Sequence, residues 1–172
     1  MTVLVTGGAK CGKSHFAEML FSGFEGRKLY IATMQPYGEE AFAAIERHRK
    51  MRSGKGFETV EKYTDIDEIN LPESCGILLE CNANLCANEM FKDENITDPT
   101  EKIIRGFEHL KRRAKLFVMV TNEVGNDGVS YESGTAKYIE IMGEINRHAA
   151  KISDTVVECV YGIPVPLKGE LP

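Results

Sequence analysis

The residues with the clearest chemistry lie near the N-terminus, where Gly7-Gly8-Ala9-Lys10-Cys11-Gly12-Lys13-Ser14 matches the pattern GxxxxGK[ST]. The glycines of this pattern let successive backbone N–H groups point into one hollow, which accepts phosphate oxygens. We expect Lys13 to reach the β- and γ-phosphates of a nucleotide and the Ser14 hydroxyl to bind Mg²⁺. The alternative is a glycine-rich turn that binds nothing. It is disfavoured because an apolar strand-like run precedes the loop and an amphipathic run follows it.

An acidic residue at the end of another apolar strand is the expected companion of such a loop, because it organises Mg²⁺ and its water ligands. The apolar run Gly76–Leu79 is followed directly by Glu80. The alternative is that this carboxylate only caps the helix that follows. We predict Ser14 and Glu80 as the magnesium ligands.

A histidine lies within a basic segment, Ile45–Arg52, that a phosphate-binding loop alone does not require. On a helix, Ile45, His48 and Arg52 share one face because they are spaced three and four residues apart. Neighbouring arginines favour the neutral imidazole, whose free ring nitrogen can attack phosphorus, and they can also bind the phosphates of an incoming nucleotide. The alternative is an ordinary solvated basic face, which the residue types alone favour.

Apolar, β-rich runs alternate with longer stretches of helical spacing, and these elements must position the side chains named above. The strand-like runs are 3–6, 29–32, 57–60, 77–79, 116–121 and 155–160, and helical spacing occurs at 15–24, 38–52, 98–113 and 133–151. The alternation predicts an α/β fold in which helices cover both faces of a mostly parallel sheet, within one domain of 172 residues. The tail 162–172, rich in Pro and Gly, is predicted to be irregular and to pack along a sheet edge or fray.

Composition and charge exclude several classes of function. The chain has 26 acidic against 21 basic residues, a formal charge of −5, so no general attraction to nucleic acid or anionic lipid is expected. The sequence shows neither an apolar run long enough for membrane insertion nor a signal-peptide pattern. Five cysteines without a CxxC pair argue against a disulfide scaffold and a structural zinc site. These features predict a cytoplasmic protein without a nucleic-acid partner.

Several motifs, in order along nearly the whole chain, resemble one enzyme family. They are the strand and loop ending in GGAKCGKS, Tyr30-Ile31-Ala32-Thr33, IERHRKMR at 45–52 with Phe57-Glu58-Thr59-Val60-Glu61, Leu78-Leu79-Glu80-Cys81, and Val120-Thr121-Asn122-Glu123-Val124-Gly125 followed by Gly143-Glu144-Ile145-Asn146. Together they are similar to the bifunctional adenosylcobinamide kinase/adenosylcobinamide-phosphate guanylyltransferase family of cobalamin biosynthesis. The histidine–arginine segment and the TNEVG loop carry most of the specificity, because many families share the phosphate-binding loop.

The resemblance implies two reactions: phosphorylation of the aminopropanol hydroxyl of adenosylcobinamide, and transfer of GMP from GTP to the new phosphate to give adenosylcobinamide-GDP. It also implies a GMP-histidine intermediate, at His48 by motif position. The implied cofactors are Mg²⁺ and GTP, with ATP or GTP as phosphate donor, and the implied substrate is a corrinoid. The implied architecture is a RecA-like P-loop NTPase fold assembled as a homotrimer. The implied nucleotide-binding residues are Gly7 to Ser14, Ala32, Thr33, Met34, Arg49, Lys50, Met51, Arg52, Glu61 and Glu80.

The segment after the TNEVG loop departs from the family pattern. Two arginines expected there are Ala136 and Ile139, and an expected proline is Ser130. Arginines at such positions can clamp phosphate, so their loss can weaken or redirect one of the two activities. Two alternatives therefore stay open: a P-loop small-molecule kinase without transferase activity, and a nucleotide-binding regulatory protein that lacks one or both activities.

Overall fold

The structure is a computed structural model that describes residues 1–93, 96–125 and 128–171. Its elements follow one another as β1 (Thr2–Thr6), α1 (Lys13–Met19), β2 (Lys28–Ala32), α2 (Gly38–Arg52), β3 (Phe57–Glu61), a 3₁₀ helix (Ile66–Glu68), β4 (Cys75–Glu80), α3 (Asn82–Met90), α4 (Thr100–Arg113), β5 (Ala114–Val120), α5 (Ser133–Ile152), β6 (Thr155–Val160) and β7 (Ile163–Lys168). All seven strands join one sheet in the order β3-β2-β4-β5-β1-β6-β7. The strands from β1 to β6 run parallel, whereas β7 pairs antiparallel with β6.

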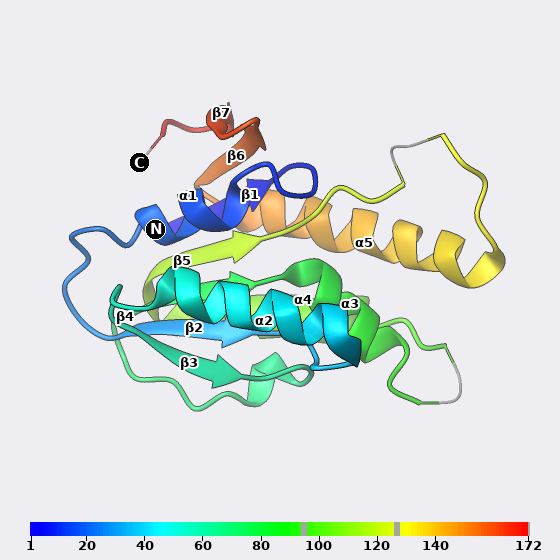
Figure 1. Ribbon diagram of the computed structural model, residues 1–172, viewed down its shortest axis with the longest axis horizontal. Helices are drawn as coiled ribbons and strands as arrows, with labels where there is room; N and C mark the ends of the chain where they lie inside the picture. Colours follow the sequence, from blue (N-terminus) through cyan, green and yellow to red (C-terminus); the bar gives the residue numbers. More distant parts are fainter. Residues whose placement is uncertain (94–95, 126–127, 172) are drawn as a thin grey trace.

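Helices cover both faces of this sheet, as the sequence predicted (Figure 1). Helix α1 contacts β1, β4, β5 and β6, and it lies with α2 in front of the sheet in Figure 1, whereas α4 and α5 lie behind it. The central strands are buried on both faces, which explains their continuous apolar runs, such as Val3-Leu4-Val5 and Ile77-Leu78-Leu79. Within the described ranges, no helix is long and apolar enough to cross a membrane.

The two longest predicted helices are confirmed within one or two residues at each end. On α4 the buried residues include Ile103, Phe107 and Leu110, which fall on one face at helical spacing. On α5 the buried residues are Ile141, Met142, Ile145 and Ala149, again on one face. Helix α2 has the predicted bounds, but unlike α4 and α5 most of its side chains are partly or fully exposed. It therefore contributes little to the core and covers one end of the sheet.

Two parts of the chain differ from the expectations. The tail packs along a sheet edge, as predicted, but residues 163–168 are not irregular, because they form the edge strand β7. Pro164 and Pro166 are compatible with a strand there because they are two residues apart, which places both missing N–H groups on one side. Helix α3 was not predicted. Its nine residues are too few for a clear helical period, and Asn82 and Asn84 favour turns over helix interiors.

The phosphate-binding loop connects the end of β1 to the start of α1 and needs glycine at two particular positions. Gly7 has a φ of 137° and Gly12 a φ of 99°, values that side chains rarely allow. A Cβ on Gly7 would also lie 2.6 Å from the carbonyl oxygen of Cys159 on β6. By contrast, a Cβ on Gly8 would meet no atom within 4 Å. The loop therefore depends on Gly7 for its close approach to β6, and not on Gly8.

Replacing Gly7 by Ala should destabilise the protein by about 1–3 kcal/mol, because the new methyl group overlaps backbone that has little freedom to move. Gly8→Ala is the matched control in the same loop, and it should change the free energy of unfolding by less than about 0.5 kcal/mol. Urea denaturation of both variants measures the difference. Equal stability of the two variants would contradict this account of the loop.

Candidate functional site

The carboxyl ends of β2, β3, β4 and β5 meet at one edge of the sheet, and a cavity of about 430 Å³ opens between this edge, the phosphate-binding loop and α2. The three predicted motifs all contribute to it. The predicted site residues that line the cavity are Ala9, Lys10, Lys13, Ser14, Ala32, Met34, His48, Arg49, Arg52, Glu61 and Glu80. The fold thus brings the loop, the basic helix and the acidic strand ends to one place.

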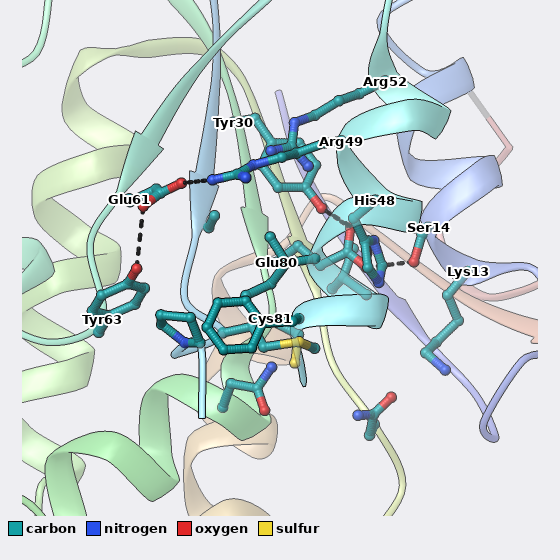
Figure 2. A pocket seen from close by; sticks show the side chains of 18 of the residues that line it. Lys13, Ser14, Tyr30, His48, Arg49, Arg52, Glu61, Tyr63, Glu80 and Cys81 are labelled. Atoms are coloured by element: carbon teal, nitrogen blue, oxygen red, sulfur yellow. Dashed lines mark hydrogen bonds and ion pairs between the residues drawn. The ribbon is translucent and has the colours of Figure 1, made fainter. Parts of the chain in front are cut away.

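Glu80, at the end of β4, lies at the centre of this arrangement (Figure 2). One carboxylate oxygen, Oε1, accepts a hydrogen bond from the Ser14 hydroxyl. The other, Oε2, accepts a hydrogen bond from the Tyr30 hydroxyl at 2.9 Å. Glu80 and Ser14 were both predicted as metal ligands, and the structure places them in direct contact although 66 residues separate them.

His48 projects from α2 toward the same carboxylate (Figure 2). Its Nδ1 lies 3.7 Å from Glu80 Oε1 and 3.5 Å from the Tyr30 hydroxyl. The sequence predicted the basic neighbours of this imidazole on its own helix, but not the acidic partner that β4 supplies. The histidine therefore has a carboxylate on one side, arginines on its own helix and an opening to the cavity.

The two arginines of α2 that line the cavity are held in different ways. Arg52 is buried, its Nε donates to Thr59 Oγ1 at 3.1 Å, and its guanidinium lies 4.2 Å from the centre of the Tyr30 ring. Arg49 is exposed, and its Nη2 donates to Glu61 Oε1 at 2.5 Å. This hydrogen bond to Arg49 lowers the pKa of the Glu61 carboxyl below its usual value. Arg52 is thus fixed in place, whereas Arg49 is held by a solvent-exposed ion pair.

Lys13 lies inside the phosphate-binding loop, where its Nζ donates to the carbonyl oxygen of Gly8 at 2.6 Å. Its side chain is buried, so its charge is concentrated at the floor of the cavity. The loop residues Gly7, Gly8, Cys11 and Gly12 shape the turn but are not among the residues that line the cavity. This placement is expected, because the glycines of such a loop bind phosphate through their backbone N–H groups.

Three further predicted residues lie outside the lining of the cavity. Thr33 is fully buried beneath it, and its Oγ1 donates to the carbonyl oxygen of Cys81 at 2.9 Å and accepts the N–H of Cys81 at 2.7 Å. It therefore joins the ends of β2 and β4 and so supports Glu80 from below. Lys50 and Met51 are exposed on α2. A side-chain contact of these three with a nucleotide was expected, and their placement gives it no support.

The cavity also contains residues that the sequence analysis did not assign to the site: Tyr30, Pro36, Phe42, Ile45, Tyr63, Cys81, Asn84, Val120 and Asn122. Tyr30 is the most informative of them, because it is buried and contacts both Glu80 and His48. A signal was available in the sequence. A tyrosine within an apolar strand needs a hydrogen-bond partner for its hydroxyl when it is buried.

The positions that depart from the family pattern lie away from the cavity. Ala136 and Ser130 are exposed, and Ile139 packs on Gly125, with its Cγ2 2.8 Å from the place that a Cβ on Gly125 would occupy. Asn126 and Asp127, which belong to the same departing segment, lie outside the described residues. A branched apolar side chain thus fills the space beside Gly125, at a position where the family resemblance led us to expect an arginine.

The donor set at Ser14 and Glu80 fits Mg²⁺, which takes hard oxygen ligands and commonly uses one or two protein oxygens together with substrate phosphates and water. Among the described residues, no group of three or more His, Cys, Asp or Glu could hold a metal ion by itself. A magnesium ion here therefore depends on phosphate oxygens that a nucleotide in the loop supplies.

Comparison with solved structures shows the same fold in a P-loop ATPase. A prototypical ATPase from the type III secretion system of pathogenic bacteria superposes with a TM-score of 0.55 at 8% sequence identity, over 96% of this chain and 56% of that one. At this identity the likeness concerns the fold alone. It confirms the expected RecA-like architecture.

Comparison with characterised sequences is more specific. The sequence model of the CobU family, described as cobinamide kinase / cobinamide phosphate guanyltransferase, matches residues 3–167. The bifunctional adenosylcobalamin biosynthesis protein CobU is 35% identical in Escherichia coli and 33% in Salmonella typhimurium, in each case over 98% of this chain and the whole relative. CobP of Pseudomonas aeruginosa, with the same description, is 27% identical over 99% of both chains. The chain therefore belongs to the cobinamide kinase / cobinamide phosphate guanyltransferase family, a family of kinases and nucleotidyltransferases.

Proposed function

We propose that this protein phosphorylates adenosylcobinamide and then transfers GMP from GTP to the product through a covalent intermediate on His48, giving adenosylcobinamide-GDP. The observation that carries the proposal is the contact of the phosphate-binding loop with the histidine through one carboxylate: Glu80 accepts from Ser14 and faces His48 Nδ1 at 3.7 Å. A kinase alone needs the loop and the acid. It does not need a histidine directed into the same cavity.

The proposed transfer consists of two displacements at the α-phosphorus of GTP. In the first, an imidazole nitrogen of His48 forms a bond to the α-phosphorus, the bond from this phosphorus to the bridging oxygen breaks, and pyrophosphate leaves. In the second, a phosphate oxygen of adenosylcobinamide phosphate forms a bond to the same phosphorus, and the phosphorus–nitrogen bond breaks. The histidine thus divides one displacement between two anions into two in-line steps, and arginine and Mg²⁺ can compensate the negative charge in each.

The chain's own residues supply the binding groups for these steps. Lys13 and the backbone N–H groups of the loop bind the β- and γ-phosphates, and Arg49 and Arg52 lie on the same helix as His48 to bind the phosphates of the nucleotide or of the corrinoid. Ser14 and Glu80 hold Mg²⁺, which when bound neutralises phosphate charge. In the kinase reaction the same loop binds the ATP or GTP that donates its γ-phosphate.

The proposal predicts that GTP labelled on the α-phosphate, incubated with the protein and Mg²⁺, leaves a protein label that is labile in acid and stable in base, as a phosphoramidate is. His48→Ala should abolish the label. His148→Ala, on α5 and outside the cavity, is the matched control and should keep it. GTP labelled on the γ-phosphate should leave no such label.

An assay of cobinamide phosphorylation on the same protein samples distinguishes the two alternatives, a kinase without transferase activity and a nucleotide-binding regulatory protein. We expect His48→Ala to keep this activity, because the γ-phosphate passes directly to the corrinoid hydroxyl. A wild-type protein that phosphorylates cobinamide but never takes up α-label would be a kinase only. A protein that binds nucleotide without either activity would be a regulatory homologue, and both outcomes would overturn the proposal.

The magnesium assignment is tested at Ser14. Ser14→Ala removes one of the two expected ligands, so the Mg²⁺ concentration for half-maximal activity should rise by about tenfold or more. Ser22→Ala, in the exposed turn after α1, is the control and should leave the requirement unchanged. An unaltered Mg²⁺ requirement in Ser14→Ala would remove Ser14 from the metal site.

We also propose that the protein is a homo-oligomer, as the resemblance to a trimeric family implies. The support is an apolar surface around the edge strand β7, where Tyr161, Ile163 and Leu167 are exposed. Exposed apolar residues on an open sheet edge favour association with another chain.

Ile163→Lys should shift the mass measured by light scattering toward a single chain, because it places a charge on that edge. Phe91→Lys changes an exposed apolar residue at the end of α3 and should leave the mass unaltered. A wild-type protein that is monomeric at micromolar concentration would contradict the proposed association.

A further inference from the structure

We propose that Tyr30 is a positioning residue of the transfer step: its hydroxyl orients the Glu80 carboxylate toward Nδ1 of His48, so that Nε2 is the atom that receives the nucleotidyl group. This inference rests on the proposed function, and it assigns a role to a residue within strand β2 that the motif analysis left unassigned.

The geometry around the Tyr30 hydroxyl connects three elements of the fold (Figure 2). The hydroxyl donates to Glu80 Oε2 on β4 at 2.9 Å and lies 3.5 Å from His48 Nδ1 on α2. The second oxygen of the same carboxylate, Oε1, lies 3.7 Å from Nδ1 and accepts from Ser14. With one oxygen tied to Tyr30, the carboxylate cannot rotate freely, and Oε1 stays between the loop and the imidazole.

The Tyr30 side chain itself has little freedom. It is 2% exposed, the Arg52 guanidinium covers its ring at 4.2 Å, and the Phe57 ring packs against it edge-on with centroids 6.1 Å apart. A carboxylate oxygen can only accept a hydrogen bond, so in the 2.9 Å contact the Tyr30 hydroxyl is the donor and Glu80 Oε2 the acceptor.

The two groups nearest to Nδ1, the Glu80 carboxylate and the Tyr30 hydroxyl, both favour the imidazole tautomer that carries its proton on Nδ1. A carboxylate only accepts hydrogen bonds, so a neutral His48 that faces Glu80 is stabilised with its proton on Nδ1. The lone pair then lies on Nε2. When Nε2 forms the bond to the α-phosphorus and pyrophosphate leaves, the ring becomes cationic and keeps its Nδ1 proton. Glu80 balances this charge, as the carboxylate of a Ser-His-Asp triad does for its histidine.

The distance of 3.7 Å from Nδ1 to Oε1 is an ion-pair distance, longer than a hydrogen bond. Catalytic hydrogen bonds are often long before substrate binds and shorten in the complex. The hydrogen bond from Tyr30 favours such a shortening, because it holds the acceptor carboxylate in one orientation. Loss of the hydroxyl would leave Glu80 with two competing partners, Ser14 and His48, and no fixed orientation.

Tyr30→Phe is the sharpest variant, because it removes only the hydroxyl and keeps the ring that Arg52 and Phe57 contact. We expect uptake of α-label from GTP to slow by about 10- to 100-fold, a typical effect of losing a group that orients a reacting residue. Phosphorylation of cobinamide should slow by a smaller factor, because it does not pass through His48. The Kd for GTP, measured by calorimetry, should stay within about threefold of wild type.

Two structural readouts separate positioning from a general loss of stability. In protein with ¹⁵N-labelled histidine, wild-type His48 should show the tautomer protonated on Nδ1, and the ³¹P–¹⁵N coupling of the intermediate should place the nucleotidyl group on Nε2. Tyr30→Phe should show a mixture of tautomers. Tyr138→Phe is the matched control: this half-buried tyrosine on α5 donates to the carbonyl oxygen of Ala83 at 3.1 Å, outside the cavity, and its loss should change neither readout.

The outcomes are distinguishable from failure of the proposed function. No α-label on the wild-type protein would overturn the GMP-histidine itself. A wild-type label on Nε2 together with a Tyr30→Phe variant that labels at the wild-type rate would overturn only the role of Tyr30. A wild-type label on Nδ1 would overturn the orientation argument, and equal slowing of both reactions in Tyr30→Phe would reduce Tyr30 to a structural residue.

Discussion

The carboxylate of Glu80 is the point on which the rest of the site depends. It accepts hydrogen bonds from Ser14 of the phosphate-binding loop and from Tyr30 of β2, and it faces His48 of α2. These elements are far apart in the sequence, and they meet because the carboxyl ends of parallel strands lie at the same edge of the sheet. A single charged group at the end of β4 thus links the loop that binds the triphosphate to the histidine proposed to react with it.

In the proposed function, one nucleotide site serves both reactions. The loop and its lysine bind phosphates whichever phosphorus reacts, and the choice between γ- and α-phosphorus depends on which acceptor lies in line. The histidine is mounted on α2, an exposed helix that covers the site without belonging to the core. Two groups that bind charge are buried or nearly so: Lys13 is held by the Gly8 carbonyl of the loop, and Glu80 lies at the end of β4. The groups that bind charge thus lie in the core of the fold, and the histidine proposed to react lies on the helix that covers the site.

Much of this could be predicted from sequence, for identifiable reasons. The loop and Glu80 lie in short segments whose local pattern predicts both structure and chemistry. The local pattern around His48 predicts the helix, but the residue types there favour a solvated basic face, and the role expected for His48 came from the family resemblance. The sequence indicates that the Tyr30 hydroxyl needs a partner but not which one, because the partner depends on β2 pairing with β4, a contact between residues 50 positions apart. The edge strand β7 was missed because its prolines oppose a strand locally, and only pairing with β6 stabilises it. Thr33 was read as a ligand residue because of its motif, whereas burial gives it a supporting role.

The central claim is that the loop and His48 act on the same nucleotide. A crystal structure of the protein with Mg²⁺ and a GTP analogue that cannot be cleaved between the α- and β-phosphates tests it most directly. The account predicts the β- and γ-phosphates in the loop at Lys13 and the α-phosphorus about 3–3.5 Å from Nε2 of His48, the separation expected of reacting atoms. A nucleotide whose phosphates occupy the loop while its α-phosphorus lies far from the imidazole, with Glu80 turned away from His48, would contradict it.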